Sequence, residues 1–237
     1  GSQDSVISDK QGIANSGELG YKESSIITKN KLLERSTCTN DELADYLYVI
    51  DNDRGTSYYN EFINNGTWSD NIQIPKNPSV LKANGKINWG KATEGGYVLK
   101  KDGTADKDKY IPQIGEIIDR FGEANGTFAS PIINGKSYSH NQRSLPYIED
   151  KAHYHKYEVI GNISKLREYV VNCKDTALKN EIENIITIIY GGDFNKAISY
   201  KGNIRGIEGW GSGGGTQYEF PITIKLLENL GILKEIF

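Results

Sequence analysis

Two arginines lie in short motifs of turn-forming residues, where a guanidinium could bind a phosphate. Arg120 belongs to the sequence DRFG at 119–122, and Arg143 belongs to RSLP at 143–146. A guanidinium donates paired, charge-assisted hydrogen bonds to phosphate oxygens, so two such groups could hold a pyrophosphate. Phe128 follows the first motif and could stack on a base or a pyridine ring. Taken singly, a solvated arginine and a core aromatic are the commoner interpretations.

A histidine and a glutamine lie beside predicted strands in two further clusters. His155 enters a strand, where alternation places it on one face with His153 and Tyr157. Two histidines at this spacing lack a third metal ligand nearby, so a proton relay or a hydrogen-bond donor is favoured over a metal site. The glycines of 209–215 permit close backbone approach to a ligand, or form a flexible loop. Gln217 stands at the entrance of the strand that follows.

The composition argues against several classes of protein. The 237 residues carry 28 Lys and Arg against 31 Asp and Glu, a net charge of −3, so no basic surplus favours binding to nucleic acid. No apolar run reaches the roughly 18 residues that a transmembrane helix needs. Cys38 and Cys173 allow one disulfide or two buried thiols. With only three histidines to join them, these two cysteines do not support a zinc site.

The amino-terminal part of the chain is predicted to be an arm followed by a few helices. The chain has no methionine and begins Gly1-Ser2, which we interpret as a cloning scar on a fragment of a longer protein. Residues 1–28 are polar and aperiodic, which is typical of a linker or loosely attached arm. Residues 29–72 are predicted to form a small helical lead-in.

The strongest helix signal in this lead-in covers residues 39–50. Thr39 and Glu42 form a capping-box pattern before apolar residues at helical spacing. The polar run 51–55 ends in glycine and is predicted to stop the helix. A second, short amphipathic piece is predicted around 58–63.

Residues 73–237 are predicted to form one α+β domain. Short β-like runs alternate with Gly and Asn turns, which predicts a compact mixed sheet of short strands, over 97–99, 157–160 and 217–220. Residues 116–121 are predicted to form either a further strand or one turn of helix. A helical insert is predicted at about 163–200, because apolar residues recur at helical spacing there before a Gly-Gly pair. A final helix is predicted over 222–229.

Five motifs, taken in order, resemble the tuberculosis necrotizing toxin domain family. They are DRFG at 119–122, GTFASP at 126–131, RSLP at 143–146, YHKYEV at 154–159 and GGGTQY at 213–218. Each motif alone is weak, but the five occur in the family's order between about residue 75 and the carboxyl terminus. The ordered set is therefore specific.

The resemblance implies an NAD+ glycohydrolase, a hydrolase that releases nicotinamide from NAD+, or from NADP+, and leaves ADP-ribose. Such domains are secreted toxins that deplete NAD+ in the cytosol of a target cell, as in interbacterial competition. NAD+ is then the substrate, and no cofactor or metal is implied. The resemblance also implies a cognate immunity protein that covers the active site. The charge balance and the lack of a long apolar run add the expectation of no nucleic acid partner and no membrane segment in this fragment.

Carried over position by position, the family's functional residues fall on Arg120, Phe128, Arg143, His155 and Gln217. The resemblance implies that both arginines bind the pyrophosphate, that Phe128 packs against nicotinamide and that Gln217 holds the ribose hydroxyls or the attacking water. His155 would orient the site by hydrogen bonding, and Gln217, His155 and Arg120 form the predicted catalytic set. We expect these side chains to meet around one dinucleotide-sized cavity. The 62 residues from His155 to Gln217 exceed the spacing in compact family members, and the insert at 163–200 supplies the excess.

Two other functions fit parts of the sequence. Gln217 and Glu219 have the Gln-x-Glu shape of some ADP-ribosyltransferase toxins, and strand alternation puts both side chains on one face. The high Tyr and Gly content also permits a non-catalytic binding module. Nicotinamide release by the wild-type chain would exclude the binding module, and the fate of labelled ADP-ribose separates transfer from hydrolysis.

Overall fold

The computed structural model of the chain describes residues 27–34, 37–50, 52–69, 72–88, 94–146, 149 and 151–237. These residues form two compact units, each assembled from three stretches of the chain. Unit 1 contains the described residues up to Ala105 together with His140–Asp150 and Ile204–Gly214. Unit 2 contains Asp106–Ser139, Lys151–Asn203 and Gly215–Phe237. The predicted domain boundaries after residues 28 and 72 stay predictions, because compactness alone does not identify a sequence domain.

The helices predicted near the amino terminus are present in unit 1. They are α2 (Lys29–Leu33), α3 (Asn40–Ile50) and α4 (Asn52–Asn65). The Thr39 hydroxyl accepts a hydrogen bond from the backbone N–H of Glu42 at 3.2 Å, as the capping pattern predicted for the start of α3. Of the predicted arm, residues 1–26 lie outside the described residues, whereas Ile27 is buried in the core of unit 1.

The predicted end of the first helix at residue 50 is confirmed, but residues 52–55 of the predicted stop already belong to the next helix, because α4 begins at Asn52 and includes Gly55. A Cβ atom at Gly55 would lie 2.5 Å from the backbone carbon of Leu47 in α3. The glycine therefore permits close helix packing instead of ending a helix. The short piece predicted at 58–63 is accordingly the second half of a longer helix.

The rest of unit 1 is irregular chain that packs around the apolar core of this unit. Short 3₁₀ turns occur at Pro78–Val80 and Glu94–Gly96. The strand predicted at 97–99 is reduced to isolated bridges, from Tyr97 to Ile204 and from Leu99 to Ala105. The largest buried side chain of this core is Trp210. Trp210 belongs to the glycine-rich segment 209–215, so one end of this segment is packed into the core of unit 1.

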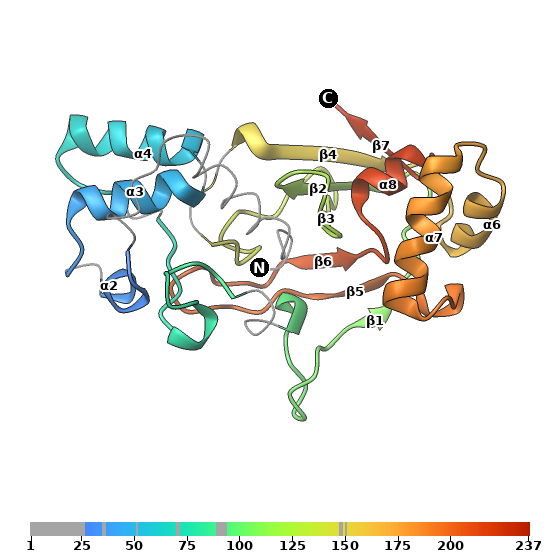
Figure 1. Cartoon of the computed structure of the whole chain (residues 1–237), viewed down its shortest axis with the longest axis horizontal. Coiled ribbons are helices and arrows are strands. Elements are labelled where there is room, and N and C mark those ends of the chain that lie inside the picture. The colour runs from blue at the N-terminus through green and yellow to red at the C-terminus, as the bar shows by residue number, and fades with distance from the viewer. Residues whose placement is uncertain are drawn as a thin grey trace. The chain divides into compact units, whose positions relative to one another are not determined.

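Unit 2 contains a seven-stranded sheet in the order β1-β5-β6-β3-β2-β4-β7 (Figure 1). The strands are β1 (Asp108–Lys109), β2 (Ile117–Phe121), β3 (Phe128–Pro131), β4 (Tyr154–Val159), β5 (Tyr200–Asn203), β6 (Thr216–Glu219) and β7 (Leu233–Ile236). The α+β class is confirmed. Each strand pairing that the structure describes is antiparallel, a direction that the predicted mixed sheet had left open.

The helical insert predicted at 163–200 is present as 3₁₀ turns and two helices. They are Ile163–Lys165, α6 (Leu166–Val171), α7 (Thr176–Tyr190) and Phe194–Lys196. The Asp175 carboxylate caps the start of α7, and Gly191 ends it in the left-handed conformation. After β6, Thr223 caps α8 (Ile224–Asn229), whose apolar side chains join those of α7 in the core of unit 2. Figure 1 shows α7 next to α8, from which the chain continues into β7.

Two further features predicted from the sequence concern the pairing of the cysteines and the presence of a membrane-spanning helix. Cys38 and Cys173 are partly buried thiols and do not form a disulfide, which decides between the two predicted alternatives. Their sulfhydryls donate to the carbonyl oxygens of Lys31 and Asp175. Among the described residues, no helix combines the length and apolar character that crossing a bilayer requires.

Candidate functional site

Arg120 and His155 are direct neighbours on adjacent strands. The register of β2 and β4 pairs Arg120 with His155 and Ile118 with Tyr157. Residues that oppose each other in an antiparallel pair point to the same side of the sheet. Ile118 and Tyr157 belong to the main apolar core of unit 2. Arg120 and His155 therefore lie on the face that packs against this core.

The guanidinium of Arg120 is engaged with the backbone of its own unit. Its Nε donates to the carbonyl oxygen of Glu123 at 2.9 Å, and one terminal nitrogen donates to that of Phe128 at 2.8 Å. The residue is fully buried. These two charge-assisted hydrogen bonds, to the carbonyls of Glu123 and Phe128, join β2 to the turn that leads into β3.

The last residue of the DRFG motif makes that turn possible. Gly122 has a φ of 121°, a backbone conformation that residues with a Cβ rarely adopt. Its N–H donates to the carbonyl of His153 at 2.8 Å. The motif is therefore a sharp exit from β2 that is tied to the entrance of β4.

Gln217 and Phe128 lie on the opposite face of the same sheet. The register pairs Phe128 with Glu219 and Ala129 with Tyr218, so Gln217, two residues before Glu219, shares the face of Phe128. Ala129 and Tyr218 point to the core side with Ile118. Gln217 is fully buried and Phe128 is 7% exposed.

The predicted site residues of unit 2 thus form two pairs, one on each face. A single shared cavity requires all four side chains on one face of the sheet. Arg120 and His155 instead lie on one face, and Phe128 and Gln217 lie on the other. The physical reason is the period of two along each strand combined with the observed register, which puts Arg120 and Phe128 out of phase. The prediction that Gln217 and Glu219 share a face agrees with this alternation. Glu219 pairs with Lys107 at 3.0 Å.

Three side chains that the sequence analysis did not single out share the face of Gln217. Asp119 and Ser130 oppose each other in β2 and β3, and both are fully buried. Tyr154 of β4 donates its hydroxyl to a carboxylate oxygen of Asp119 at 2.6 Å. Its ring also lies 5.0 Å from that of Phe121, centroid to centroid. Strand alternation within DRFG is enough to predict that Asp119 and Phe121 lie on the face opposite to Arg120. Only the register between the strands shows that this is the face of Gln217.

His155 belongs to a small ionisable cluster at the β4–β7 edge. Its Nδ1 lies 3.1 Å from a carboxylate oxygen of Glu235 in β7, and both side chains are 25% exposed. The Tyr157 hydroxyl is buried without a hydrogen-bond partner among the described residues, and burial raises its pKa. His153 lies in the 3₁₀ turn Lys151–His153, outside β4, so it does not share the strand alternation predicted for it.

Glu228 of α8 makes this cluster sensitive to pH. Burial, followed by the charge of Glu235, raises the pKa of Glu228 above its ordinary 4.5, while the charge of His155 opposes the shift. A carboxyl with a raised pKa binds more protons in the folded state, so stability falls as pH rises through the window between the ordinary and the raised value. We expect Glu228→Gln to remove this slope and to raise the melting temperature at pH 7. Thermal unfolding between pH 4 and 8 tests this; an unchanged slope would contradict it.

Arg143 lies in unit 1, in the turn that follows His140. Its N–H donates to the His140 carbonyl at 3.2 Å, and its side chain is fully buried. The next residue, Ser144, donates its hydroxyl to the carbonyl of Arg205 at 2.6 Å. Arg143 is thus held in a tightly bonded loop of its own unit.

The glycine-rich segment packs against this loop instead of forming an open cradle. A Cβ atom at Gly211 would lie 2.6 Å from the Cα of Ser144. The N–H groups of Ser212 and Gly213 donate to the side-chain and backbone oxygens of Asn141. The close backbone approach predicted for 209–215 is therefore made to the RSLP loop of the same unit.

Metal ligands do not cluster in the part of the chain that the structure describes. There, no group of three or more His, Cys, Asp or Glu side chains could hold a metal ion.

The family model described as tuberculosis necrotizing toxin matches residues 113–174. No protein in the curated collection matches the chain significantly. A solved structure described as tuberculosis necrotizing toxin complexed with its immunity factor aligns at 14% identity. The alignment has a TM-score of 0.40 and covers 66% of this chain and 66% of that one, slightly less than two thirds of its length.

The matched range contains four of the five motifs, and the structure joins the fifth to them. DRFG, GTFASP, RSLP and YHKYEV all fall within 113–174, whereas GGGTQY lies beyond it. The strand of that fifth motif, β6, pairs directly with β3 of the matched range. Residues 113–174 of this chain are therefore similar to the tuberculosis necrotizing toxin family.

Proposed function

We propose that this toxin-family domain hydrolyses the bond between nicotinamide and ribose in NAD+, or in NADP+. The observation that carries the proposal is the match of residues 113–174 to the toxin family, with β6 and Gln217 added to that segment by direct pairing with β3. The resemblance of the five motifs supplies the substrate and the reaction.

The reaction suits a site without a strong acid. Nicotinamide leaves NAD+ as a neutral molecule, taking the electron pair of the C–N bond, so no general acid has to protonate it. The ribose carbon passes through an oxocarbenium-like transition state and accepts an oxygen from water, as in glycoside hydrolysis. The products are nicotinamide, ADP-ribose and one proton. Catalysis then rests on positioning, which can contribute on the order of 7–11 kcal/mol for ideal geometry.

We assign direct contact with the substrate to Gln217 and Phe128. They share one face of the sheet, on β6 and at the start of β3. The carboxamide of Gln217 would hold the ribose hydroxyls or the attacking water without adding charge, and the ring of Phe128 would pack against nicotinamide. Both are expected to act in water-poor surroundings, because both are buried.

We give Arg120 and His155 positioning roles, in place of the direct roles that the resemblance implies. Arg120 donates to the carbonyl of Phe128, so it supports the residue that would contact nicotinamide. His155 is bonded through Nδ1 to Glu235 on the core-facing side. The implied phosphate-binding role of Arg143 remains a prediction.

The biological setting follows from the same resemblance. We propose that the parent protein is a secreted toxin whose domain acts in the cytosol of a target cell, for example in competition between bacteria. Loss of NAD+ would kill the producing cell too, so a cognate immunity protein that covers the active site is part of the proposal.

The experiment is incubation of the whole chain with NAD+ labelled in the adenosine half, followed by chromatography and gel analysis. We expect equal amounts of free nicotinamide and ADP-ribose, and no label on protein. Label transferred to protein would favour the ADP-ribosyltransferase, which the shared face of Gln217 and Glu219 permits. Absence of nicotinamide release from both NAD+ and NADP+ would overturn the enzyme proposal and favour a binding module.

A further inference from the structure

The helical insert forms one wall of a cavity that the proposed reaction does not use. The cavity measures about 700 Å³ and is lined by β1 with the chain after it, by the start of α6 and by residues 194–199. Sites for small organic ligands typically measure about 300–1,000 Å³. All of the lining residues belong to unit 2, and Gln217 and Phe128 are not among them.

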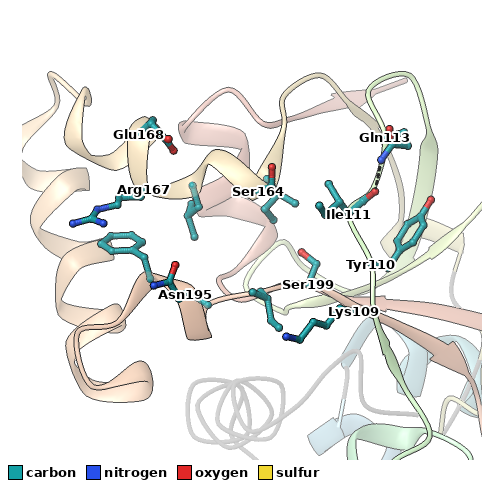
Figure 2. A pocket seen from close by; sticks show the side chains of 14 residues that line it. Lys109, Tyr110, Ile111, Gln113, Ser164, Arg167, Glu168, Asn195 and Ser199 are labelled. Carbon is teal, nitrogen blue, oxygen red and sulfur yellow. Dashed lines mark hydrogen bonds between the residues drawn. The ribbon is translucent and has the colours of Figure 1, made fainter.

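A buried hydroxyl faces this cavity without a hydrogen-bond partner. Ser199 is 5% exposed, and its Oγ has no partner among the described residues. Its backbone carbonyl is engaged, since it accepts from the N–H of Tyr110 at 3.0 Å. Figure 2 shows the Ser199 hydroxyl directed into the space between the surrounding elements. Because an unpaired buried hydroxyl is costly, a ligand atom that bonds to it would recover that cost.

The charges around the cavity favour an anion. Lys109 and Arg167 both line it, and neither forms an ion pair within the described part of the chain. Glu168 is the acidic side chain of the lining, so the lining is net positive in a chain whose net charge is −3. Figure 2 shows the two cations on different sides of the cavity. An anionic group could therefore approach either cation while another atom reaches Ser199.

The rest of the lining combines apolar side chains with the polar residues Gln113, Ser164 and Asn195. Ile163, Leu166 and Phe194 of the insert and Ile111 of the opposite wall all line the cavity. Ile111 is 46% exposed, so an apolar surface is available on this wall. A ligand with an apolar or aromatic body would cover this surface, whereas a small inorganic anion would leave it wet.

We propose that this cavity binds a small organic anion, a carboxylate or a phosphate ester attached to an apolar or aromatic body. The anionic group binds Lys109 or Arg167, one oxygen bonds to Ser199, and the body packs against the insert. The site is independent of the proposed function, because it shares no residue with it.

The test is a titration of the whole chain, followed by amide NMR, with 2-naphthoate, 1-naphthyl phosphate and the neutral 2-naphthamide. We expect saturable binding of at least one anion, with shifts confined to 109–113, 163–168 and 194–199. The carboxylate and phosphate probes distinguish the two anionic groups. The amide should bind roughly tenfold more weakly or worse, since it cannot pair with a cation.

Ser199→Ala is the decisive variant. It removes a hydroxyl that has no partner, so its melting temperature should equal or exceed that of the wild type. The affinity for the anion should nevertheless fall roughly three- to tenfold. The matched control is Ser164→Ala, whose hydroxyl lines the same cavity but already donates to Asn162 at 2.6 Å, and it should leave the affinity unchanged.

The charges are tested with Lys109→Gln combined with Arg167→Gln. This double variant should weaken the anion roughly tenfold and remove the salt dependence of binding, while the neutral amide is unaffected. The proposal is overturned if no probe binds saturably, if the amide binds as well as the anions, or if neither Ser199→Ala nor the double variant changes the affinity. Because NAD+ cleavage is measured separately, its failure would leave this result unaffected.

Discussion

Gln217→Ala is expected to reduce the turnover of NAD+ roughly 10²–10³-fold, the loss typical of removing one preorganised hydrogen-bonding group from a transition state. Gln217 is fully buried in β6, so its backbone is fixed in the sheet and its side chain is packed before any substrate binds. Because the contact would form mainly in the transition state, kcat should fall more than the KM for NAD+ rises. Release of nicotinamide, measured by chromatography over a range of NAD+ concentrations, gives both constants.

Two further variants distinguish a catalytic role of Gln217 from a loss of activity that is caused by unfolding. Gln217→Glu keeps the size of the side chain but replaces its amide donor, and it should also be inactive while the thermal unfolding transition remains cooperative. Gln113→Ala removes an exposed glutamine that donates to the Ile111 carbonyl, and it should keep full activity. Wild-type turnover in folded Gln217→Ala would remove Gln217 from the mechanism.

Arg120→Ala is expected to destabilise unit 2 by about 3–5 kcal/mol. The guanidinium is fully buried and donates to the carbonyls of Glu123 and Phe128, which would lose their partner in the variant. Arg120→Lys should recover only part of the loss, since an ammonium cannot reproduce the fixed fork that serves both oxygens. Denaturation of both variants in urea measures the difference in the free energy of unfolding.

The same variants separate a positioning role from phosphate binding. A guanidinium kept only for a phosphate would be a buried charge awaiting its ligand, and its removal would leave stability unchanged or increase it. Arg167→Ala, which removes an exposed arginine of the same unit, should change the unfolding free energy by no more than about 0.5 kcal/mol. Equal stability of Arg120→Ala and the wild type would return Arg120 to the substrate-binding role.

Local signals in the sequence were sufficient for most of the helices. Apolar residues from Leu178 to Ile186 line the buried side of α7, and Gly191 ends it as predicted. The Thr39 hydroxyl, which caps the first turn, likewise marked the start of α3. Such signals are readable because a helix is stabilised by residues three and four positions apart and by caps at its ends.

Glycines were harder to interpret, because the same residue serves a turn or a close contact. Gly55 looked like the end of a helix, yet it allows α4 to approach α3. Gly211 looked like part of a ligand cradle, yet it packs on Ser144. In both cases the partner lies elsewhere in the chain, so no local pattern could distinguish the two uses.

The sequence by itself determined the α+β class and the helical insert, and its five ordered motifs indicated a resemblance to the tuberculosis necrotizing toxin family. It also determined that side chains alternate along each strand. Only the tertiary structure decided which strands are neighbours and in which register they pair, and so which side chains share a face. That is why Arg120 and His155 separate from Phe128 and Gln217: a period of two is a local property, whereas the phase between two strands depends on contacts between residues distant in the chain.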